Sequence, residues 1–247
     1  MTLVEVQRDG GIAVLRLNRP DKHNALSVAV ENELLAALGS PEVTGSAAVL
    51  LTGNGRSFCA GADVTEIREL STDAILAYYR ASGRVYEALS ALRQPSVAAV
   101  HGYCLGGGFE LALAADFRVA DGTARFGFPE VGLGILPSSG GTLRVVRACG
   151  PVLARELLLL GDRFDASRAR TLGLVTEVVN DGAALDRALE LAHRLAELPA
   201  AAVEVVTQTI DAVAEAPAAT ALLVERLAYA ALNATSEATA RQAAFGS

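Results

Sequence analysis

The sequence predicts an α/β protein whose strand and helix units are followed by a region made of helices alone. Residues 47–51 and 96–101 are apolar runs typical of strands buried on both faces. Each run enters a glycine-rich loop, and a helical pattern follows each loop. After about residue 180 only helical patterns remain. We therefore expect a core of residues 1–180 that holds the active site. Residues 181–247 are expected to form a helical subdomain that covers the core or joins a neighbouring subunit.

The composition excludes several classes of function. The chain has 247 residues, a net charge of −7 and 51% hydrophobic residues, so it can bury a sizeable core. An acidic protein lacks the basic face that nucleic acid requires. No apolar run approaches the roughly 20 residues that span a bilayer, and the first residues do not resemble a secretory signal. We therefore expect no nucleic-acid partner, no membrane association and a cytoplasmic location.

The cysteines and histidines, the residue types that most often bind metal ions, are scattered along the chain. Cys59, Cys104 and Cys149 are odd in number and widely spaced, which fits neither a disulfide framework nor a zinc site. The three histidines have no Cys, His or Asp partner at ligand spacing. We therefore expect no metal ion and no separate cofactor.

The first half of the chain divides into alternating elements. A hairpin comes first, then a polar loop over 18–24, and then a helix that Ser27 can cap. Asp63 ends the next glycine-rich loop and can cap the helix after it. The expected strands are 3–7, 12–17, 47–51, 96–101, 116–120, 124–127 and 175–179. The expected helices are 28–38, 64–70, 74–92, 111–115, 143–149, 153–160, 166–172, 183–198, 200–214, 218–233 and 237–244.

The stretch 102–110 is the most informative part of the chain. It contains the three glycines Gly106, Gly107 and Gly108 and then Glu110, between a strand pattern and a helix pattern. Glycine lets a backbone approach a ligand closely, and a helix N-terminus has unpaired N–H groups. Such a turn suits stabilising an oxyanion while a proton moves. The alternative is a close-packed turn in which Glu110 has no chemical role.

A second glycine-rich loop ends at 60–63, after the preceding strand. In parallel α/β sheets the carboxyl ends of strands form the ligand crevice, so we expect 60–63 and 106–110 on one rim. Residues 126–142 are irregular yet apolar, which predicts a buried wall with one carboxylate, Glu130. A carboxyl group in such a setting tends towards a raised pKa and acid/base use. Alternatively, Glu130 caps a short helix after Pro129.

Other catalytic patterns do not match. The segment 138–141 resembles a nucleophilic serine motif only loosely, and no dinucleotide-binding glycine pattern follows the first strand. Lys22 is the single lysine among 21 basic residues, which hints that an ammonium group is useful there. An ordinary solvated loop lysine is the alternative.

Several ordered motifs together resemble the enoyl-CoA hydratase/isomerase, or crotonase, superfamily. The resemblance covers about residues 10–180 and is closest to the enoyl-CoA hydratases. The motifs that carry it are Asn18-Arg19-Pro20, Asn24-Ala25-Leu26, the loop from Phe58 to Asp63, the stretch from His101 to Glu110, the segment from Phe126 to Gly134, Pro137 to Thr142, and Ala169 with Leu172 to Val175.

The resemblance implies a crotonase (ClpP/crotonase-like) fold of repeated ββα units with a C-terminal helical region, assembled as a homotrimer or a dimer of trimers. It implies an acyl-CoA thioester substrate and a place in fatty-acid metabolism. The amides of Ala62 and Gly107 would form the oxyanion hole, and Glu110 and Glu130 would be catalytic. The positions implied to bind substrate or CoA are Arg19, Lys22, Ala25, Ala60, Asp63 and Ile67.

Family members that hydrate enoyl-CoA place two glutamates around the water, and this chain has both. We therefore expect a hydro-lyase in which Glu110 and Glu130 hold the water and move its protons, with their division of roles left open. The alternatives are an enoyl-CoA isomerase, another acyl-CoA enzyme of this scaffold, and a non-catalytic CoA-thioester binding protein. Phe128, the pair Ser138-Ser139 and the short C-terminus depart from the family pattern, so we expect a reshaped acyl pocket and no contacts from a basic tail to CoA.

Overall fold

The computed structural model describes residues 2–68 and 70–245, apart from the side chains of Ile67 and Phe245. Its larger sheet has six strands in the order β1-β2-β3-β4-β6-β9. β1 pairs antiparallel with β2, and each further pairing is parallel. The strands of this sheet are β1 (Val4–Asp9), β2 (Ile12–Leu17), β3 (Ala48–Gly53), β4 (Ser96–Val100), β6 (Phe117–Asp121) and β9 (Glu177–Val179).

A smaller sheet has the order β5-β7-β8, formed by β5 (Tyr103–Leu105), β7 (Arg125–Gly127) and β8 (Phe164–Asp165). The sequence pattern predicts β7 but neither β5 nor β8. Both are too short to show an alternating pattern, and β7 provides their backbone partners.

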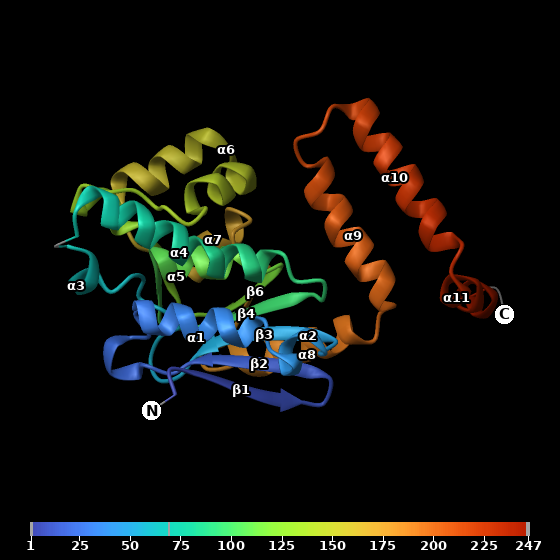
Figure 1. Ribbon diagram of the computed structural model, residues 1–247, viewed down its shortest axis with the longest axis horizontal. Helices are drawn as coiled ribbons and strands as arrows, with labels where there is room; N and C mark the ends of the chain where they lie inside the picture. Colours follow the sequence, from blue (N-terminus) through green and yellow to red (C-terminus); the bar gives the residue numbers. More distant parts are fainter. Residues whose placement is uncertain (1, 69, 246–247) are drawn as a thin grey trace.

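The larger sheet is buried on both faces. Ala13 and Leu15 of β2 point into the main apolar core, whereas Ile12 and Val14 point into a second cluster on the opposite face. Helices α1 (Val28–Leu38) and α4 (Thr72–Ser90) contribute to the main core, and α8 (Ala184–Ala196) covers the second face (Figure 1). Burial on both faces explains why the central strands read as continuous apolar runs.

Most of the remaining helices follow the sequence pattern, but the short helix Pro41–Thr44 is not predicted, and the helix that begins at Val64 ends at Ile67 rather than at residue 70. Where two helices are expected, α6 runs through both with a kink, because Gly150 leaves the helical conformation and Pro151 has no N–H to donate. These helices are α2 (Pro41–Thr44), α3 (Val64–Ile67), α5 (Gly107–Ala114), α6 (Gly141–Leu160), α7 (Ala166–Thr171), α9 (Ala200–Val213), α10 (Ala218–Asn233) and α11 (Ser236–Phe245), with the 3-10 turns η1 (Pro20–Lys22) and η2 (Pro129–Leu133).

The C-terminal helices α9, α10 and α11 stand apart from the layers of the core (Figure 1). No residue of α9 or α10 is buried. Their exposed apolar side chains are Val206, Ile210, Leu222, Leu223, Leu227 and Tyr229. The expected boundary at residue 180 precedes α8, which packs on the sheet, so the helices that stand apart begin only with α9. The division into two domains stays a prediction.

Asn24 joins two loops at the carboxyl end of the sheet. Its buried side-chain amide donates to the carbonyl oxygens of Asn54 and Ser57 at 2.9 and 2.7 Å, and its Oδ1 accepts from the Arg19 N–H at 2.9 Å. One side chain therefore fixes the polar loop after β2 against the glycine-rich loop after β3.

Two helical glycines test how tightly this region is packed. A methyl group on Gly108 of α5 would lie 2.4 Å from the carbonyl oxygen of Cys59, whereas one on Gly83 of α4 would meet nothing within 4 Å. We expect Gly108→Ala to destabilise the fold by about 1–3 kcal/mol through overpacking. Gly83→Ala, the matched control, should stabilise it by about 1 kcal/mol. Denaturant unfolding measures both, and equal effects would contradict the packing described.

Candidate active site

Two glycine-rich loops lie side by side at the carboxyl ends of β3 and β4. The backbones of Cys59 and Cys104 pair in an isolated parallel β-bridge, and both thiols are free. The Leu105 N–H donates to the Cys59 carbonyl at 3.0 Å. Gly106 has φ 49° and ψ −127°, a conformation that residues with a Cβ rarely adopt. The strand β5 thereby turns directly into α5 beneath the other loop. The expected position of 60–63 and 106–110 on one rim is confirmed.

The backbone N–H groups of Ala62 and Gly107 lie close together at this meeting point. The Leu26 N–H donates to the Gly61 carbonyl, and the Leu26 carbonyl accepts from the Asp63 N–H. In this parallel pairing the N–H of the intervening residue, Ala62, points away from Leu26. Gly107 is the first residue of α5, where an N–H has no partner within the helix. A methyl group on Gly107 would lie 3.6 Å from the Ala62 nitrogen. Two amide donors are therefore available to one small acceptor.

Glu110 lies in the first turn of α5 and is 3% exposed. The expectation that this helix begins at residue 111 is wrong: it begins at Gly107. Glycine has a low helix propensity, so the sequence pattern does not place these residues in the helix. Close packing against Cys59 nonetheless favours glycine here. The Glu110 Oε1 accepts from the N–H groups of Ser139 and Gly141 at 2.8 and 2.7 Å.

The surroundings of Glu110 include groups that raise the pKa of its carboxyl and groups that lower it. Burial raises the pKa of the Glu110 carboxyl, while the N–H groups of Gly141 and Ser139 and the charge of Arg144 oppose that rise. Gly141 also begins α6, whose N-terminus favours negative charge. The ionised form of Glu110 therefore has dedicated partners.

Glu130 lies in the turn η2 and is 9% exposed. Its Oε2 is buried without a hydrogen-bond partner in the described part of the chain. A methyl group on Gly106 would lie 2.8 Å from the Glu130 Oε1, so this carboxyl lies against the backbone of Gly106. Burial raises the pKa of Glu130 to about 7, against an opposing hydrogen bond from its own backbone N–H and with a smaller contribution from the charge of Glu110. The alternative that Glu130 caps this short helix is wrong: the N-cap is Phe128, no side chain forms a capping hydrogen bond there, and the Glu130 carboxyl lines the cavity.

Both glutamates and both loops line one cavity of about 130 Å³. The expectation of a buried wall from residues 126–142 is only partly correct. Phe126, Phe128 and Glu130 are buried, but Leu133 and Leu136 are 61% and 65% exposed. The apolar side chains Leu133, Ile135 and Leu136 line the cavity while remaining open to solvent. Phe128 stacks on Phe109 with ring centroids 4.9 Å apart and is not part of the cavity lining.

The residues expected to bind CoA are divided between the cavity and its surroundings. Ala60 lines the cavity beside Ala62. Arg19 forms an ion pair with Asp63 at 2.8 Å and donates to the Ala25 carbonyl at 3.3 Å, so its guanidinium links the two loops. Asp63 also caps α3 through the Thr65 N–H. The side chain of Ile67 lies outside the described residues.

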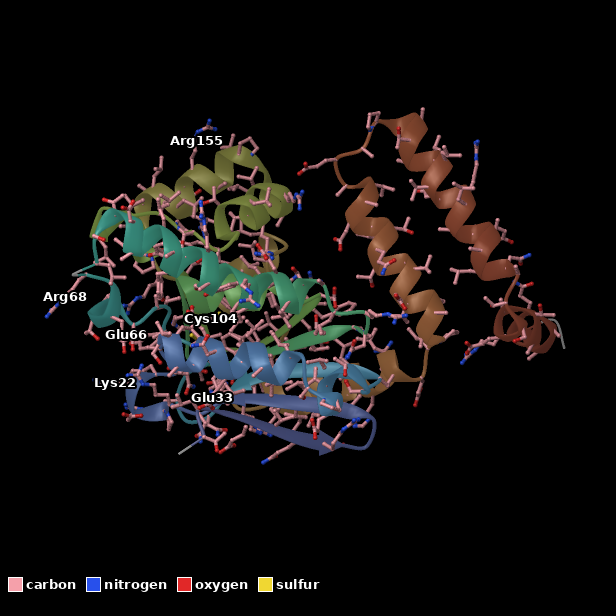
Figure 2. The ribbon with its side chains drawn as sticks, viewed as in Figure 1. Lys22, Glu33, Glu66, Arg68, Cys104 and Arg155 are labelled. Carbon is pink, nitrogen blue, oxygen red and sulfur yellow. The ribbon has the colours of Figure 1, made fainter. Side chains whose placement is uncertain are left out.

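Lys22 lies on the surface, on the turn η1. Figure 2 places it at the same end of the molecule as Glu66, whereas Cys104 lies inside. The side chain of Lys22 is exposed, whereas that of nearby Arg19 is less exposed and forms an ion pair with Asp63.

Sequence reasoning missed a second group of polar residues in the same cavity: Glu31, Tyr78 and Ser82. Glu31 is 5% exposed and its Oε1 accepts from the Ser82 hydroxyl at 2.6 Å. The available signal was the position of Glu31, which falls on the apolar face of its helix with Leu34 and Leu38. The backbone donors of Ser139 and Gly141 gave no signal beyond glycines at the start of a helix.

The described residues contain no group of three or more His, Cys, Asp or Glu side chains that suits a metal ion. Within the same residues, no helix combines the length and the apolar character needed to cross a bilayer.

Comparison with known proteins identifies the class. Residues 7–245 match the family model described as enoyl-CoA hydratase/isomerase. The chain is 36% identical to the short-chain-enoyl-CoA hydratase of Clostridium acetobutylicum, covering 98% of this chain and 94% of that one. It is 37% identical to the 2,3-dehydroadipyl-CoA hydratase of Escherichia coli, covering 96% and 92%. The crystal structure of an enoyl-CoA hydratase subunit from Geobacillus kaustophilus superimposes with a TM-score of 0.92 at 35% identity, covering 98% and 94%.

The chain therefore belongs to the enoyl-CoA hydratase/isomerase family, and its crotonase fold and superfamily membership are confirmed. The named relatives are hydro-lyases, which agrees with the expected class of enzyme.

The buried Glu31 predicts a pH-dependent stability. Burial raises the pKa of Glu31 from 4.5 to about 7, against the opposing hydrogen bond from Ser82. The folded state therefore binds this proton more tightly than the unfolded state. The corresponding stability is fully present below pH 4.5 and is lost as the pH rises through about 7. Glu31→Gln cannot titrate, so its stability relative to the unchanged protein should rise by about 3 kcal/mol between acid and alkaline pH.

Denaturant unfolding of both proteins across this pH range measures that difference. The other carboxyl groups are common to both proteins and cancel to first order. A difference that does not change with pH would contradict a burial-raised pKa for Glu31.

Proposed function

We propose that this protein is an enoyl-CoA hydratase that adds water across the 2,3 double bond of an enoyl-CoA thioester. The observation that carries the proposal is one small cavity lined by Ala62 and Gly107, whose amides are available as donors, and by two carboxyl groups of different environment. The names of the most similar relatives support the same reaction.

In this mechanism the thioester carbonyl oxygen accepts hydrogen bonds from the N–H groups of Ala62 and Gly107. As the water oxygen bonds to Cβ, electron density moves through Cα to that oxygen, and the two donors stabilise the resulting enolate. One such donor is typically worth about 3 kcal/mol of the barrier. Because the donors are backbone groups, they need no reorganisation during the reaction.

The two glutamates divide the proton transfers according to their surroundings. Glu110 is stabilised as an anion by two N–H groups, so it is the base that takes a proton from water. The Glu130 Oε2 has no hydrogen-bond partner among the described residues, and the pKa of this carboxyl is raised to about 7, so Glu130 is the acid that delivers a proton to Cα. The water loses one proton to Glu110, its oxygen bonds to Cβ, and Cα gains a proton from Glu130. Proton return from Glu110 to Glu130 through solvent completes the cycle.

The CoA portion lies outside the small cavity in this proposal. Lys22 is the exposed cation of the polar loop and interacts with CoA phosphate or adenine. Arg19 contributes indirectly, since it holds the loop that carries Ala25 against the loop that carries Ala60 and Asp63. Ile67 completes the acyl side on the basis of its sequence position alone.

The assembly is proposed to be a homotrimer or a dimer of trimers. The supporting observation is the exposed apolar surface of α9 and α10, which none of the described residues of the same chain cover.

The carboxyl pair gives the most direct test of function. We expect Glu110→Gln and Glu130→Gln each to lower the rate of crotonyl-CoA hydration by about 10²–10⁴-fold, because each removes one proton-transfer group. Loss of the enoyl-thioester absorbance measures the rate, and butyryl-CoA binding should survive in both variants. Glu42→Gln, on the exposed surface of α2, is the matched control and should keep full activity. Full activity in either active-site variant would contradict the mechanism.

Product analysis accompanies this assay. A 3-hydroxyacyl-CoA product supports hydration, whereas a shifted double bond would identify an isomerase instead.

The pH dependence of kcat/KM gives an independent test. Glu130 must be protonated to donate, so the rate should fall as the pH rises above about 7. Glu110 must be ionised to accept, so the rate should also fall on the acid side. The residual activity of Glu130→Gln should lack the alkaline limb. A rate that stays constant from neutral to alkaline pH would contradict the assignment of Glu130 as the acid.

A further inference from the structure

The cavity contains a third carboxyl group that the hydration mechanism does not use. Glu31 projects from α1, and its partner Ser82 projects from α4. Glu31 and Ser82 are 5% and 4% exposed, whereas Leu133 and Leu136 of the same cavity are 61% and 65% exposed. The Glu31 side is therefore the closed end of the cavity, and the apolar segment after η2 forms its open side.

A stripe of polar groups connects the closed end to the amide donors. Tyr78, Ser82 and Tyr86 lie four residues apart on α4, so they share one face of that helix. Tyr86 reaches Gly107, because a methyl group on Gly107 would lie 3.0 Å from the Tyr86 hydroxyl oxygen. Tyr78 lies at the other end of the stripe. An acyl group held by its carbonyl at Gly107 thus has a polar path towards Glu31.

Tyr78 supplies an independent sign of a missing partner. Its hydroxyl oxygen is buried and has no hydrogen-bond partner in the described part of the chain. A buried hydroxyl left unpaired destabilises the fold, so such groups usually have a role. An alkyl chain would leave both Tyr78 and the Glu31 carboxyl without a further partner.

We propose that the closed end of this cavity binds a hydroxyl group at the distal end of the acyl chain. The proposal rests on the proposed function, because it names the substrate class of the same site. A hydroxyl donates to the Glu31 carboxylate and accepts from the Tyr78 hydroxyl, so one small neutral group satisfies both. The substrates are then short ω-hydroxy-2-enoyl-CoA thioesters rather than plain fatty enoyl-CoA thioesters, since the cavity is only about 130 Å³.

Charge disfavours the two other polar chain ends. A terminal carboxylate would meet Glu31, Glu110 and Glu130 in one small cavity, and like charges there repel. A terminal ammonium would favour ionisation of the nearby carboxyl groups, including Glu130, which must keep its proton to act as an acid. A hydroxyl group avoids both conflicts.

The test compares ω-hydroxy-2-enoyl-CoA thioesters with 2-enoyl-CoA thioesters that carry a methyl group in place of the hydroxyl, over a series of chain lengths. Above pH 7, where Glu31 is ionised, we expect kcat/KM to favour the hydroxyl compound by about tenfold to a hundredfold at the best length, as for hydrogen bonds to a charged group. In Glu31→Met this ratio should fall to about one or reverse. Tyr78→Phe and Ser82→Ala should each reduce the ratio several-fold, and they test the proposal if Glu31→Met does not fold.

Tyr103→Phe is the matched control, because Tyr103 lies in β5 and is not part of the cavity lining. It should keep the ratio of the unchanged protein. Preference for the methyl compounds, or for 2-enoyl-CoA thioesters with a terminal carboxylate or ammonium group assayed beside them, would overturn the proposal. So would a ratio that Glu31→Met, Tyr78→Phe and Ser82→Ala all leave unchanged.

A binding measurement separates this proposal from the proposed function. Calorimetry with the saturated ω-hydroxyacyl-CoA and acyl-CoA thioesters needs no turnover, and the hydroxyl compound should bind at least several-fold more tightly. If no 2-enoyl-CoA is hydrated but this preference holds, the proposed function fails and the hydroxyl site stands. If crotonyl-CoA is hydrated but the preference is absent, the hydroxyl site fails alone. Failure of both saturated thioesters to bind would overturn it as well.

Discussion

The site depends on the close backbone approach of the segment around Cys59 to the segment around Gly106. Backbone pairing between Cys59 and Cys104 fixes the two loops against each other, and there is no room for a side chain at Gly108 between them. This approach places the Ala62 and Gly107 amides side by side. It also sets the start of α5, and therefore the direction in which Glu110 enters the cavity. Backbone packing, rather than any single side chain, positions the electrophilic part of the site.

The rest of the chemistry follows from unequal surroundings of similar groups. Three carboxyl groups line one cavity, and burial raises the pKa of each. Glu110 receives two N–H donors, Glu31 receives a serine hydroxyl, and the Glu130 Oε2 receives none. The same residue type can thus serve as a base, as a substrate-binding group and as an acid, because each has a different set of partners.

Most of the fold is visible in the sequence because the central strands are buried on both faces and the helices carry clear apolar stripes. The short strands β5 and β8 cannot be predicted from the sequence, because their pairing with β7 defines them and no local pattern does. The glycine turn, Ala62, Glu110 and Glu130 could be named in advance from ordered motifs. Glu31, Ser82 and Tyr78 were not found, because their meeting depends on how α1 packs against α4. Proximity across packed helices is a tertiary property that spacing along the chain does not encode.

The central claim is that two backbone amides polarise a thioester carbonyl at the meeting of the two loops. Infrared difference spectroscopy of bound butyryl-CoA, labelled with ¹³C at the thioester carbonyl, tests it most directly. Butyryl-CoA has no double bond to hydrate, so the complex is stable during the measurement. Two donors at Ala62 and Gly107 predict a carbonyl stretch at clearly lower frequency than in water. A stretch at or above its frequency in water would contradict the account.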